Sequence, residues 1–317
     1  MLFISILIFL SATAKAYDEK VSCKVSTNEK YGKTCRLENV NLEIMNRLEV
    51  EIDTKSLKYV YFQNSEVKSF SEVFLEQLRE MEYFNANQVG LERVDGRSLA
   101  KMKSLLVFWA GENKLEELKE NLFSGNVKLE SIHLSFNQIQ YIHPRAFDGL
   151  GNLLVLDLSS NKLKTLTNVF DPLTELIRLV LSQNPIEEFN VNIFKKLKQL
   201  RELKLLNVNL KRLDPEVFYP LTSLEYINVS FNKSPLRRID GNLFKHNYHL
   251  QEIIFIKNRI QSIDPKFFRN YKPKLKHISV RMNSCIDKDI LHIKDGAIED
   301  SEMEKFKKCF RNFSNDK

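Results

Sequence analysis

A pattern of apolar residues recurs through most of the chain and limits what the chain can fold into. From Leu129 the order is L-x-x-L-x-L-x-x-N, followed by spaced Ile and Phe residues, and the same order starts again 24 residues later at Leu153. A unit this short cannot bury its apolar face alone, so successive units must stack. The sequence therefore predicts an elongated solenoid in which each unit contributes one short strand and a return loop.

About ten units follow this pattern, with starts spaced 23–26 residues apart. Their first apolar residues are Leu57, Met81, Leu105, Leu129, Leu153, Leu176, Leu200, Leu224, Leu250 and Leu275. The unit that starts at Leu224 has two extra residues, which predicts a protruding loop around Pro235, Arg237 and Arg238. Such an insertion marks a contact surface in some solenoids, and a tolerated surface insertion explains it equally well.

Two further residue types recur once in each unit. A buried Asn can form hydrogen bonds to loop backbone groups in its own turn and the next. Three turns have Ser65, Val89 or Val208 at this position, which predicts that fewer of their loop backbone groups are hydrogen-bonded. The expected Asn ladder is Asn113, Asn137, Asn161, Asn184, Asn232, Asn258 and Asn283. The expected Phe spine of the core is Phe123, Phe147, Phe170, Phe194, Phe218, Phe244 and Phe268.

The segment before the repeats has the features of a secretory signal peptide. Residues 2–10 form a short apolar run, and Ala14-Lys15-Ala16 is an A-x-A cleavage site. The run is too short to span a bilayer, which needs about 20 apolar residues. We therefore divide the chain into a signal peptide (1–16), an N-terminal cap (17–56), repeats (57–284) and a C-terminal cap (285–317). We expect a secreted protein that is not membrane-spanning.

The four cysteines lie at the two ends of the predicted solenoid, which are too far apart to be bridged. This leaves Cys23–Cys35 in a β-hairpin with Gly32 near its turn, and Cys285–Cys309 in the C-terminal cap. In that cap, residues 297–313 predict one amphipathic helix with Ile298, Met303, Phe306, Phe310 and Phe313 on its apolar face. Disulfides agree with an extracellular location.

Side chains alternate along a strand, so the residues two and four positions after each unit start should point out of the sheet. The first of these are Tyr59, Tyr61, Tyr83 and the single tryptophan, Trp109. Strands favour aromatic residues in general. However, Tyr and Trp dominate binding hot spots, and an outward Trp has no core to fill. A ligand-binding surface is therefore the favoured interpretation.

The following outward positions are polar and alternate in charge: His133, Asp157, Arg178 and Glu202. They suit recognition of a protein and suit a solvated sheet equally well. His133 and Asp157 lie on adjacent predicted strands, within expected hydrogen-bonding reach as a cross-strand polar pair. Further along, Ile254 and Ser279 are also expected to point outward. The basic residues between Lys195 and Arg212 could meet an acidic surface, but a solvated face is favoured.

Sequons for N-glycosylation occur at Asn228, Asn232 and Asn312. Asn232 belongs to the buried ladder, so we expect no glycan on it. A glycan on Asn228 would obstruct part of the sheet, and Asn312 on the cap is expected to be the most accessible.

The sequence offers no catalytic motif, and the six histidines are scattered. No C-x-x-C spacing supports a zinc site. We therefore predict no catalytic residues, metal site or cofactor, and a protein that is not an enzyme. The net charge of +7 favours acidic partners without identifying one, and nucleic acid is disfavoured in a secreted chain without a nucleic-acid-binding motif.

The motif LxxLxLxxNxLxxIxPxxF in residues 129–147 resembles the typical repeat of extracellular leucine-rich repeat proteins. The resemblance covers residues 57–285 and extends to the cysteine-bearing ends. Within that group the chain is similar to insect secreted leucine-rich immune proteins and Toll-type receptor ectodomains. The resemblance implies an α/β repeat fold, a curved horseshoe-shaped leucine-rich repeat solenoid with disulfide-bonded caps. It also implies recognition of proteins or microbial ligands.

Two functions follow as hypotheses. The first is a secreted recognition protein that binds a protein or microbial-surface ligand through its concave face, in innate immunity. The second is an extracellular matrix or adhesion protein that acts by self-association. Homo- and hetero-oligomers are compatible with both hypotheses.

Overall fold

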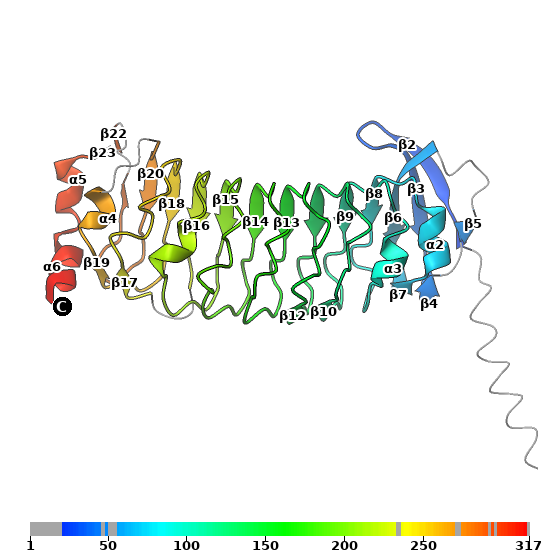
Figure 1. Ribbon diagram of the computed structural model, residues 1–317, viewed down its shortest axis with the longest axis horizontal. Helices are drawn as coiled ribbons and strands as arrows, with labels where there is room; N and C mark the ends of the chain where they lie inside the picture. The colour runs from blue at the N-terminus through cyan, green and yellow to red at the C-terminus, as the bar shows by residue number, and fades with distance from the viewer. Residues whose placement is uncertain are drawn as a thin grey trace, which may run out of the picture.

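The computed structural model describes residues 21–45, 48–49, 56–232, 236–269, 274–290, 293–294 and 297–315. The predicted signal peptide, residues 1–16, lies outside this range. The described chain forms an elongated solenoid whose turns follow one another from the N-terminal hairpin to the C-terminal helices (Figure 1). The predicted leucine-rich repeat architecture is confirmed.

One 13-stranded sheet runs the length of the solenoid. Its inner strands pair in parallel, beginning with β3 (Gly32–Glu38) and β6 (Leu57–Gln63) and ending with β20 (His277–Ser279). One antiparallel strand lies at each edge of the sheet. In spatial order the strands are β2 (Lys24–Asn28), β3 (Gly32–Glu38), β6 (Leu57–Gln63), β8 (Tyr83–Asn85), β9 (Val107–Trp109), β11 (Ser131–His133), β13 (Val155–Asp157), β14 (Arg178–Val180), β15 (Glu202–Lys204), β16 (Tyr226–Asn228), β18 (Glu252–Ile254), β20 (His277–Ser279) and β21 (Asp289–Ile290).

Shorter elements form the remainder of the turns and the two ends. The two-stranded pairs are β1 (Val21–Ser22) with β5 (Leu48–Glu49), β4 (Asn41–Met45) with β7 (Glu66–Phe70), β10 (Glu117–Leu118) with β12 (Tyr141–Ile142), β17 (Arg238–Ile239) with β19 (Ser262–Ile263), and β22 (Ile293–Lys294) with β23 (Ala297–Ile298). The helices are α2 (Glu72–Gln77), α3 (Gly96–Leu99), α4 (Lys266–Arg269), α5 (Asp300–Glu304), α6 (Lys307–Asn315) and a 3₁₀ helix over Pro215–Phe218. No helix in the described part of the chain is long and apolar enough to cross a bilayer.

The core lies between the sheet and the return loops. The central residue of each short sheet strand, such as Ile132 or Leu156, is buried. The Phe spine stacks between successive turns, with ring centroids 6.0 Å apart for Phe123 and Phe147 and 6.3 Å apart for Phe170 and Phe194. At its end the spine passes from Phe244 to the ring of Phe267, 6.1 Å away.

The Asn ladder joins each turn to the preceding one, whereas we had expected the following one. Asn137 accepts a hydrogen bond from Leu115 N at 3.0 Å and donates to Ala110 O and to its own turn at Leu134 O, at 2.8 and 3.1 Å. Its side chain therefore satisfies three buried backbone groups. Ser65 partly replaces the missing Asn, because its hydroxyl accepts from Val40 N and donates to Gln63 O.

The N-terminal cap contains the predicted hairpin and the Cys23–Cys35 disulfide, with Gly32 in the left-handed region at φ 72°. Strand β3 of this hairpin also pairs in parallel with β6, so the first turn of the solenoid lies within the segment assigned to the cap. The hairpin turn rises beside the first strands of the sheet (Figure 1).

The C-terminal cap is held by the predicted Cys285–Cys309 disulfide. The single expected helix is two shorter helices, α5 and α6, preceded by strand β23. Its apolar face is as predicted, with Phe306 and Phe313 buried. The ring of Phe268 packs against this cap, 4.5 Å from the ring of Phe306. Phe268 is therefore turned towards the cap, and Phe267 occupies the spine position that was expected for Phe268.

Candidate functional site

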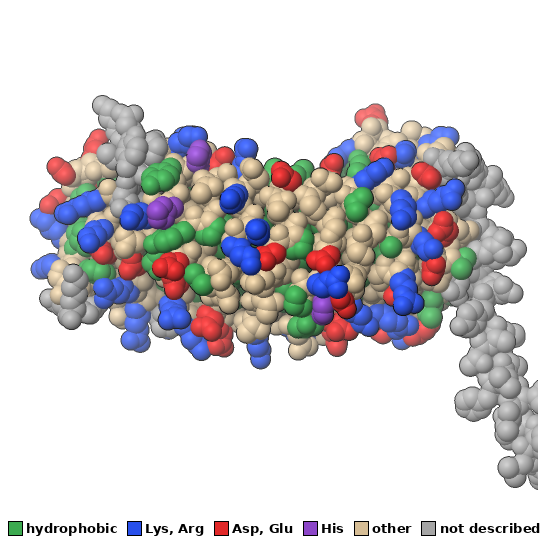
Figure 2. All heavy atoms as spheres, viewed as in Figure 1, with side chains coloured by type: hydrophobic (Ala, Val, Ile, Leu, Met, Phe, Trp, Pro, Cys, Tyr) green, Lys and Arg blue, Asp and Glu red, His purple; other side chains and the backbone are tan. Residues whose placement is uncertain are grey.

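The register of the sheet strands arranges the outward side chains in two columns. The outline of the molecule is hollowed between the hairpin and the C-terminal turns (Figure 2). The strand register places both columns where the sequence predicts them. Tyr59 pairs with Tyr83, and Tyr61 pairs with Asn85, which pairs with Trp109. Towards the C-terminus the expectation is wrong for Ile254 and Ser279, which are buried; Ser279 donates a hydrogen bond to Asp289 of the closing strand β21.

The N-terminal part of the sheet surface carries a group of aromatic rings in contact, here called the aromatic cluster. Tyr59 stacks on Tyr61 with centroids 5.4 Å apart, and Tyr83 stacks on Trp109 at 6.4 Å. The imidazole of His133 continues the row, 6.0 Å from Trp109 and nearly parallel to it. The structure therefore brings together the four aromatic residues predicted to bind a ligand.

Tyr31 completes this cluster and was missed by the sequence reasoning. It lies in the turn of the hairpin, and its ring is 4.8 Å from Tyr59, 4.9 Å from Tyr83 and 6.3 Å from Trp109. The hairpin thus folds over the end of the sheet and leaves the cluster half-buried. A signal was present in the sequence, because turns mostly contain Gly, Pro, Asn, Asp and Ser, whereas the aromatic Tyr31 stands directly before the turn glycine Gly32. Part of the aromatic content therefore serves to hold the hairpin.

Burial alters the protonation behaviour of two cluster members. The pKa of Tyr59 is raised mainly because burial penalises the phenolate, while a hydrogen bond from Asn85, at 3.1 Å, opposes the shift. The pKa of His133 is lowered, chiefly by burial; Asp157 opposes this shift and Arg178 adds to it. His133 therefore favours the neutral form next to Trp109.

His133 and Asp157 are cross-strand neighbours as predicted, but their side chains hydrogen-bond to other residues and not to each other. The His133 Nε2 atom lies 2.7 Å from the Ser131 hydroxyl. Asp157 accepts from Ser159, from its backbone N–H at 2.8 Å and from its hydroxyl at 2.6 Å. Each side chain therefore bonds within its own turn.

The middle of the sheet surface carries an ion-pair group centred on Glu202. One oxygen of its carboxylate lies 2.5 Å from Arg178 Nε and the other lies 2.7 Å from Lys204 Nζ. Lys204 also approaches the ring of Tyr226, at 5.9 Å. Two cations around one carboxylate leave this part of the surface locally positive. The group is separated from the aromatic cluster by strand β13.

Of the other basic residues in the stretch from Lys195 to Arg212, three form ion pairs with acidic residues of neighbouring turns. Lys195 is 3.0 Å from Asp171, and Lys211 is 2.5 Å from Glu187. In the inserted loop, residues 233–235 lie outside the described part of the chain. Arg238 does not protrude as expected, because its guanidinium packs 3.9 Å from the ring of Phe313 in the C-terminal cap.

The sequons differ in their surroundings. The Asn228 amide donates to Tyr226 Oη at 3.2 Å, and the oxygen of the Asn228 side chain accepts from Ser230 N at 3.1 Å. Asn232 is buried, as the ladder predicts. Asn312 is half-buried, and its amide donates to Gln261 O at 2.6 Å, so it is less accessible than expected.

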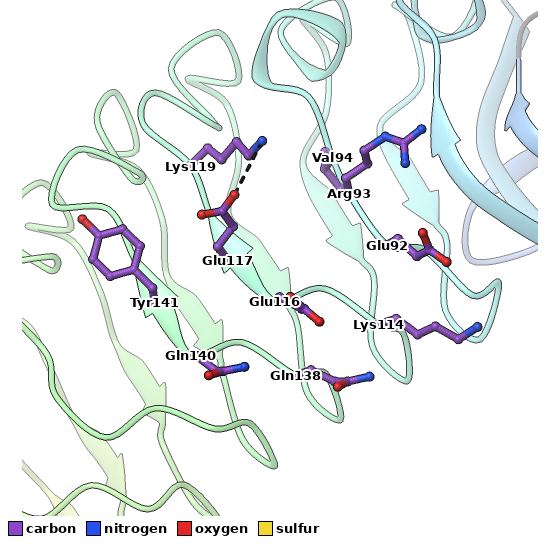
Figure 3. Close-up of a pocket in the computed structure, with 10 residues that line it drawn as sticks. All are labelled: Glu92, Arg93, Val94, Lys114, Glu116, Glu117, Lys119, Gln138, Gln140 and Tyr141. Atoms are coloured by element: carbon purple, nitrogen blue, oxygen red, sulfur yellow. Dashed lines mark ion pairs between the residues drawn. The ribbon is translucent and has the colours of Figure 1, made fainter.

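A separate depression of about 630 Å³ lies away from the sheet, beside strands β10 and β12 (Figure 3). Side chains of both charges line it, and Glu117 and Lys119 point toward each other with an ion-pair distance of 3.5 Å. Lys114 likewise lies 4.0 Å from Glu66. The acidic and basic side chains of the lining balance, so the depression has no net charge that would attract an ion of one sign. Among the described residues, no group of His, Cys, Asp and Glu is arranged to hold a metal ion.

The stacked strand-and-loop turns, the buried Asn ladder and the disulfide-bonded ends define the class: the chain is a leucine-rich repeat protein. The leucine rich repeat family profile matches residues 127–186 and 174–233. This match lies in the central repeats, and the structure extends the same leucine-rich repeat architecture along the described chain.

Comparison with known proteins gives the following similarities. Lumican from Gallus gallus is 28% identical over 187 residues, which cover 58% of this chain and 53% of lumican. Keratocan from Danio rerio is 30% identical over 140 residues, which cover 43% of this chain and 39% of keratocan. The chain thus matches about half the length of these relatives or less. The Drosophila Toll–Spatzle complex shares the fold, with a TM-score of 0.58 and 17% identity over 80% of this chain and 43% of that one.

Proposed function

We propose that this protein is a secreted recognition protein that binds a protein or a microbial-surface ligand through the concave face of its sheet. The observation that carries the proposal is the aromatic cluster. Tyr61 and Trp109 lie on the outward side of strands whose inward side already fills the core. Both remain half-exposed beside the hairpin. Half-exposed Tyr and Trp side chains on a rigid sheet are well suited to act as binding anchors.

The predicted ligand-binding residues divide into two parts under this proposal. The cluster supplies apolar contact through Tyr59, Tyr61, Tyr83 and Trp109, with His133 at its border. Arg178 and Glu202, beyond Asp157, supply polar contacts that would orient the ligand. Tyr31 forms a wall at one end, so the ligand would lie along the sheet from the hairpin towards β15. A role in innate immunity is proposed from the sequence resemblance.

The experiment is an affinity capture from extracellular fluid of the source organism, with and without added microbial cells. Wild-type bait is compared with a Tyr61→Ala/Trp109→Ala bait and with a Tyr141→Ala/Tyr248→Ala bait. Tyr141 and Tyr248 are matched controls because they are 52% and 50% exposed and lie outside the sheet. Circular dichroism and thermal melting confirm that each bait is folded. A partner lost only by the first double variant supports the proposal, whereas equal capture by all three baits contradicts it.

A second candidate is an extracellular matrix or adhesion role through self-association, and the sequence similarity to lumican and keratocan favours it. Sedimentation velocity across a hundredfold concentration range tests this candidate directly. Concentration-dependent oligomers, together with captures that contain only the bait itself, would favour it over recognition of a foreign ligand.

A further inference from the structure

One residue of each turn, directly before the Asn-ladder position, has a left-handed backbone. Its φ lies between 49° and 58° in every turn from Asn64 to Met282. This conformation favours glycine or small polar residues. Two turns nevertheless place a phenylalanine there, Phe136 and Phe231, with exposed fractions of 58% and 43%. Large side chains occupy this corner in other turns as well, such as Gln88 and Met282, so the surroundings of each Phe decide whether its exposed ring can contact a ligand.

Phe231 lines a depression of about 470 Å³, here called the corner pocket. The corner pocket draws on four successive turns and is independent of the sheet surface that we propose for recognition. Its lining residues are Gln183, Leu206, Asn207, Phe231, Asn232, Lys257 and Arg259. The backbone of this pocket is fixed, because each corner donates a hydrogen bond to the next turn. Gln183 N donates to Leu206 O at 2.7 Å, and Phe231 N donates to Ile256 O at 2.8 Å.

The corner pocket carries two cations and no acidic residue in its lining. Lys257 Nζ lies 5.5 Å from the centroid of the Phe231 ring. Several cations elsewhere on the solenoid pair with a carboxylate of a neighbouring turn, as Lys58 does with Glu82. Within the part of the chain that the structure describes, neither Lys257 nor Arg259 has such an ion pair. Their charge is therefore available for a ligand.

We propose that the corner pocket binds an acidic saccharide, a sugar that carries sulfate or carboxylate groups. The ring of Phe231 offers an apolar face for the C–H groups of a sugar ring. Lys257 and Arg259 supply charge-assisted hydrogen bonds to the anionic group. The amides of Gln183 and Asn207 have the donors and acceptors that sugar hydroxyl groups require. This combination matches an acidic sugar better than a bare inorganic anion, which would not use the aromatic ring.

The test is titration calorimetry of the full secreted chain with three tetrasaccharides: one derived from heparin, one from hyaluronan and neutral chitotetraose. We expect binding of at least one acidic tetrasaccharide, weakened about tenfold by each of Lys257→Ala and Arg259→Ala, since each removes a hydrogen bond to a charged group. Phe231→Ala should also weaken binding about tenfold. The affinity should fall as the salt concentration rises.

Two control variants separate the corner pocket from general basic attraction. Phe136→Ala removes the matched exposed aromatic residue at the same corner of another turn, and Lys196→Ala/Lys198→Ala removes two exposed lysines outside the pocket. Neither control should change the affinity. The proposal is overturned if no acidic tetrasaccharide binds, if chitotetraose binds equally well, if Phe231→Ala has no effect, or if the control variants lose as much affinity as the pocket variants. Thermal melting confirms that each variant is folded.

Discussion

Replacing Tyr31 by alanine should release the hairpin turn from the aromatic cluster. The substitution removes ring contacts with Tyr59, Tyr83 and Trp109. An aromatic pair contributes about 0.5–1.5 kcal/mol beyond its buried area. Three contacts at a half-buried turn, reduced by the entropy of ordering the turn, give about 1.5–3 kcal/mol for docking of the hairpin. Loss of this docking should increase the solvent exposure of the Trp109 side chain while the solenoid stays folded.

Intrinsic fluorescence measures this directly, because Trp109 is the single tryptophan of the chain. In Tyr31→Ala, the emission maximum should shift to longer wavelength and acrylamide should quench it more efficiently. Tyr31→Phe keeps the ring and should retain the wild-type values. Glu29→Ala, in the same turn, is the control for a change that leaves the ring contacts intact. An unchanged spectrum and unchanged quenching in Tyr31→Ala would refute the packing of the hairpin on the cluster.

Three further predictions concern stability. Asn137→Ala leaves three buried backbone groups without their partner and should lower the free energy of unfolding, measured by urea denaturation, by about 3–5 kcal/mol. The control Asn152→Ala removes an exposed side chain and should lower the free energy of unfolding by less than about 1 kcal/mol. Equal losses in the two variants would contradict the role of the Asn ladder. Cys285→Ser/Cys309→Ser opens a disulfide between residues 24 positions apart and should cost about 3 kcal/mol, and a variant as stable as wild type would refute this expectation. The pKa of His133 is lower in the folded protein than in the unfolded chain, so the unfolded chain binds a proton at His133 more readily. The contribution of neutral His133 to folding stability is therefore fully present above pH 6.5 and declines as the pH falls below 6.5. His133→Gln should flatten this dependence in thermal melts between pH 5 and 7, and an unchanged slope would contradict it.

The repeating part of the structure could be predicted from the sequence because its contacts recur at a constant interval. A residue such as Ile132 meets its equivalents Phe108 and Leu156 in the neighbouring turns, so the spacing itself identifies the contact. The same reasoning placed the outward residues Tyr59 to Glu202 in two columns.

The contacts that the sequence did not reveal involve segments that do not repeat. Tyr31 reaches Trp109 because the hairpin bends over the sheet, and no interval in the sequence links these two residues. The corner pocket was also missed, since Phe231 precedes the Asn-ladder position and its exposure follows from a left-handed backbone that the repeat pattern does not mark. Likewise, the choice between Phe267 and Phe268 depends on packing against the C-terminal cap.

The central claim is that the outward aromatic residues of the sheet contact the ligand, and site-specific photocrosslinking tests it most directly. Tyr61→benzoylphenylalanine places the crosslinker on the sheet, and Tyr141→benzoylphenylalanine places it on the opposite surface. After incubation with extracellular fluid and microbial cells, and irradiation, the adducts are identified by mass spectrometry. The account predicts a partner adduct at position 61 that is absent at position 141. The same adduct at both positions, or one found only at position 141, would contradict it.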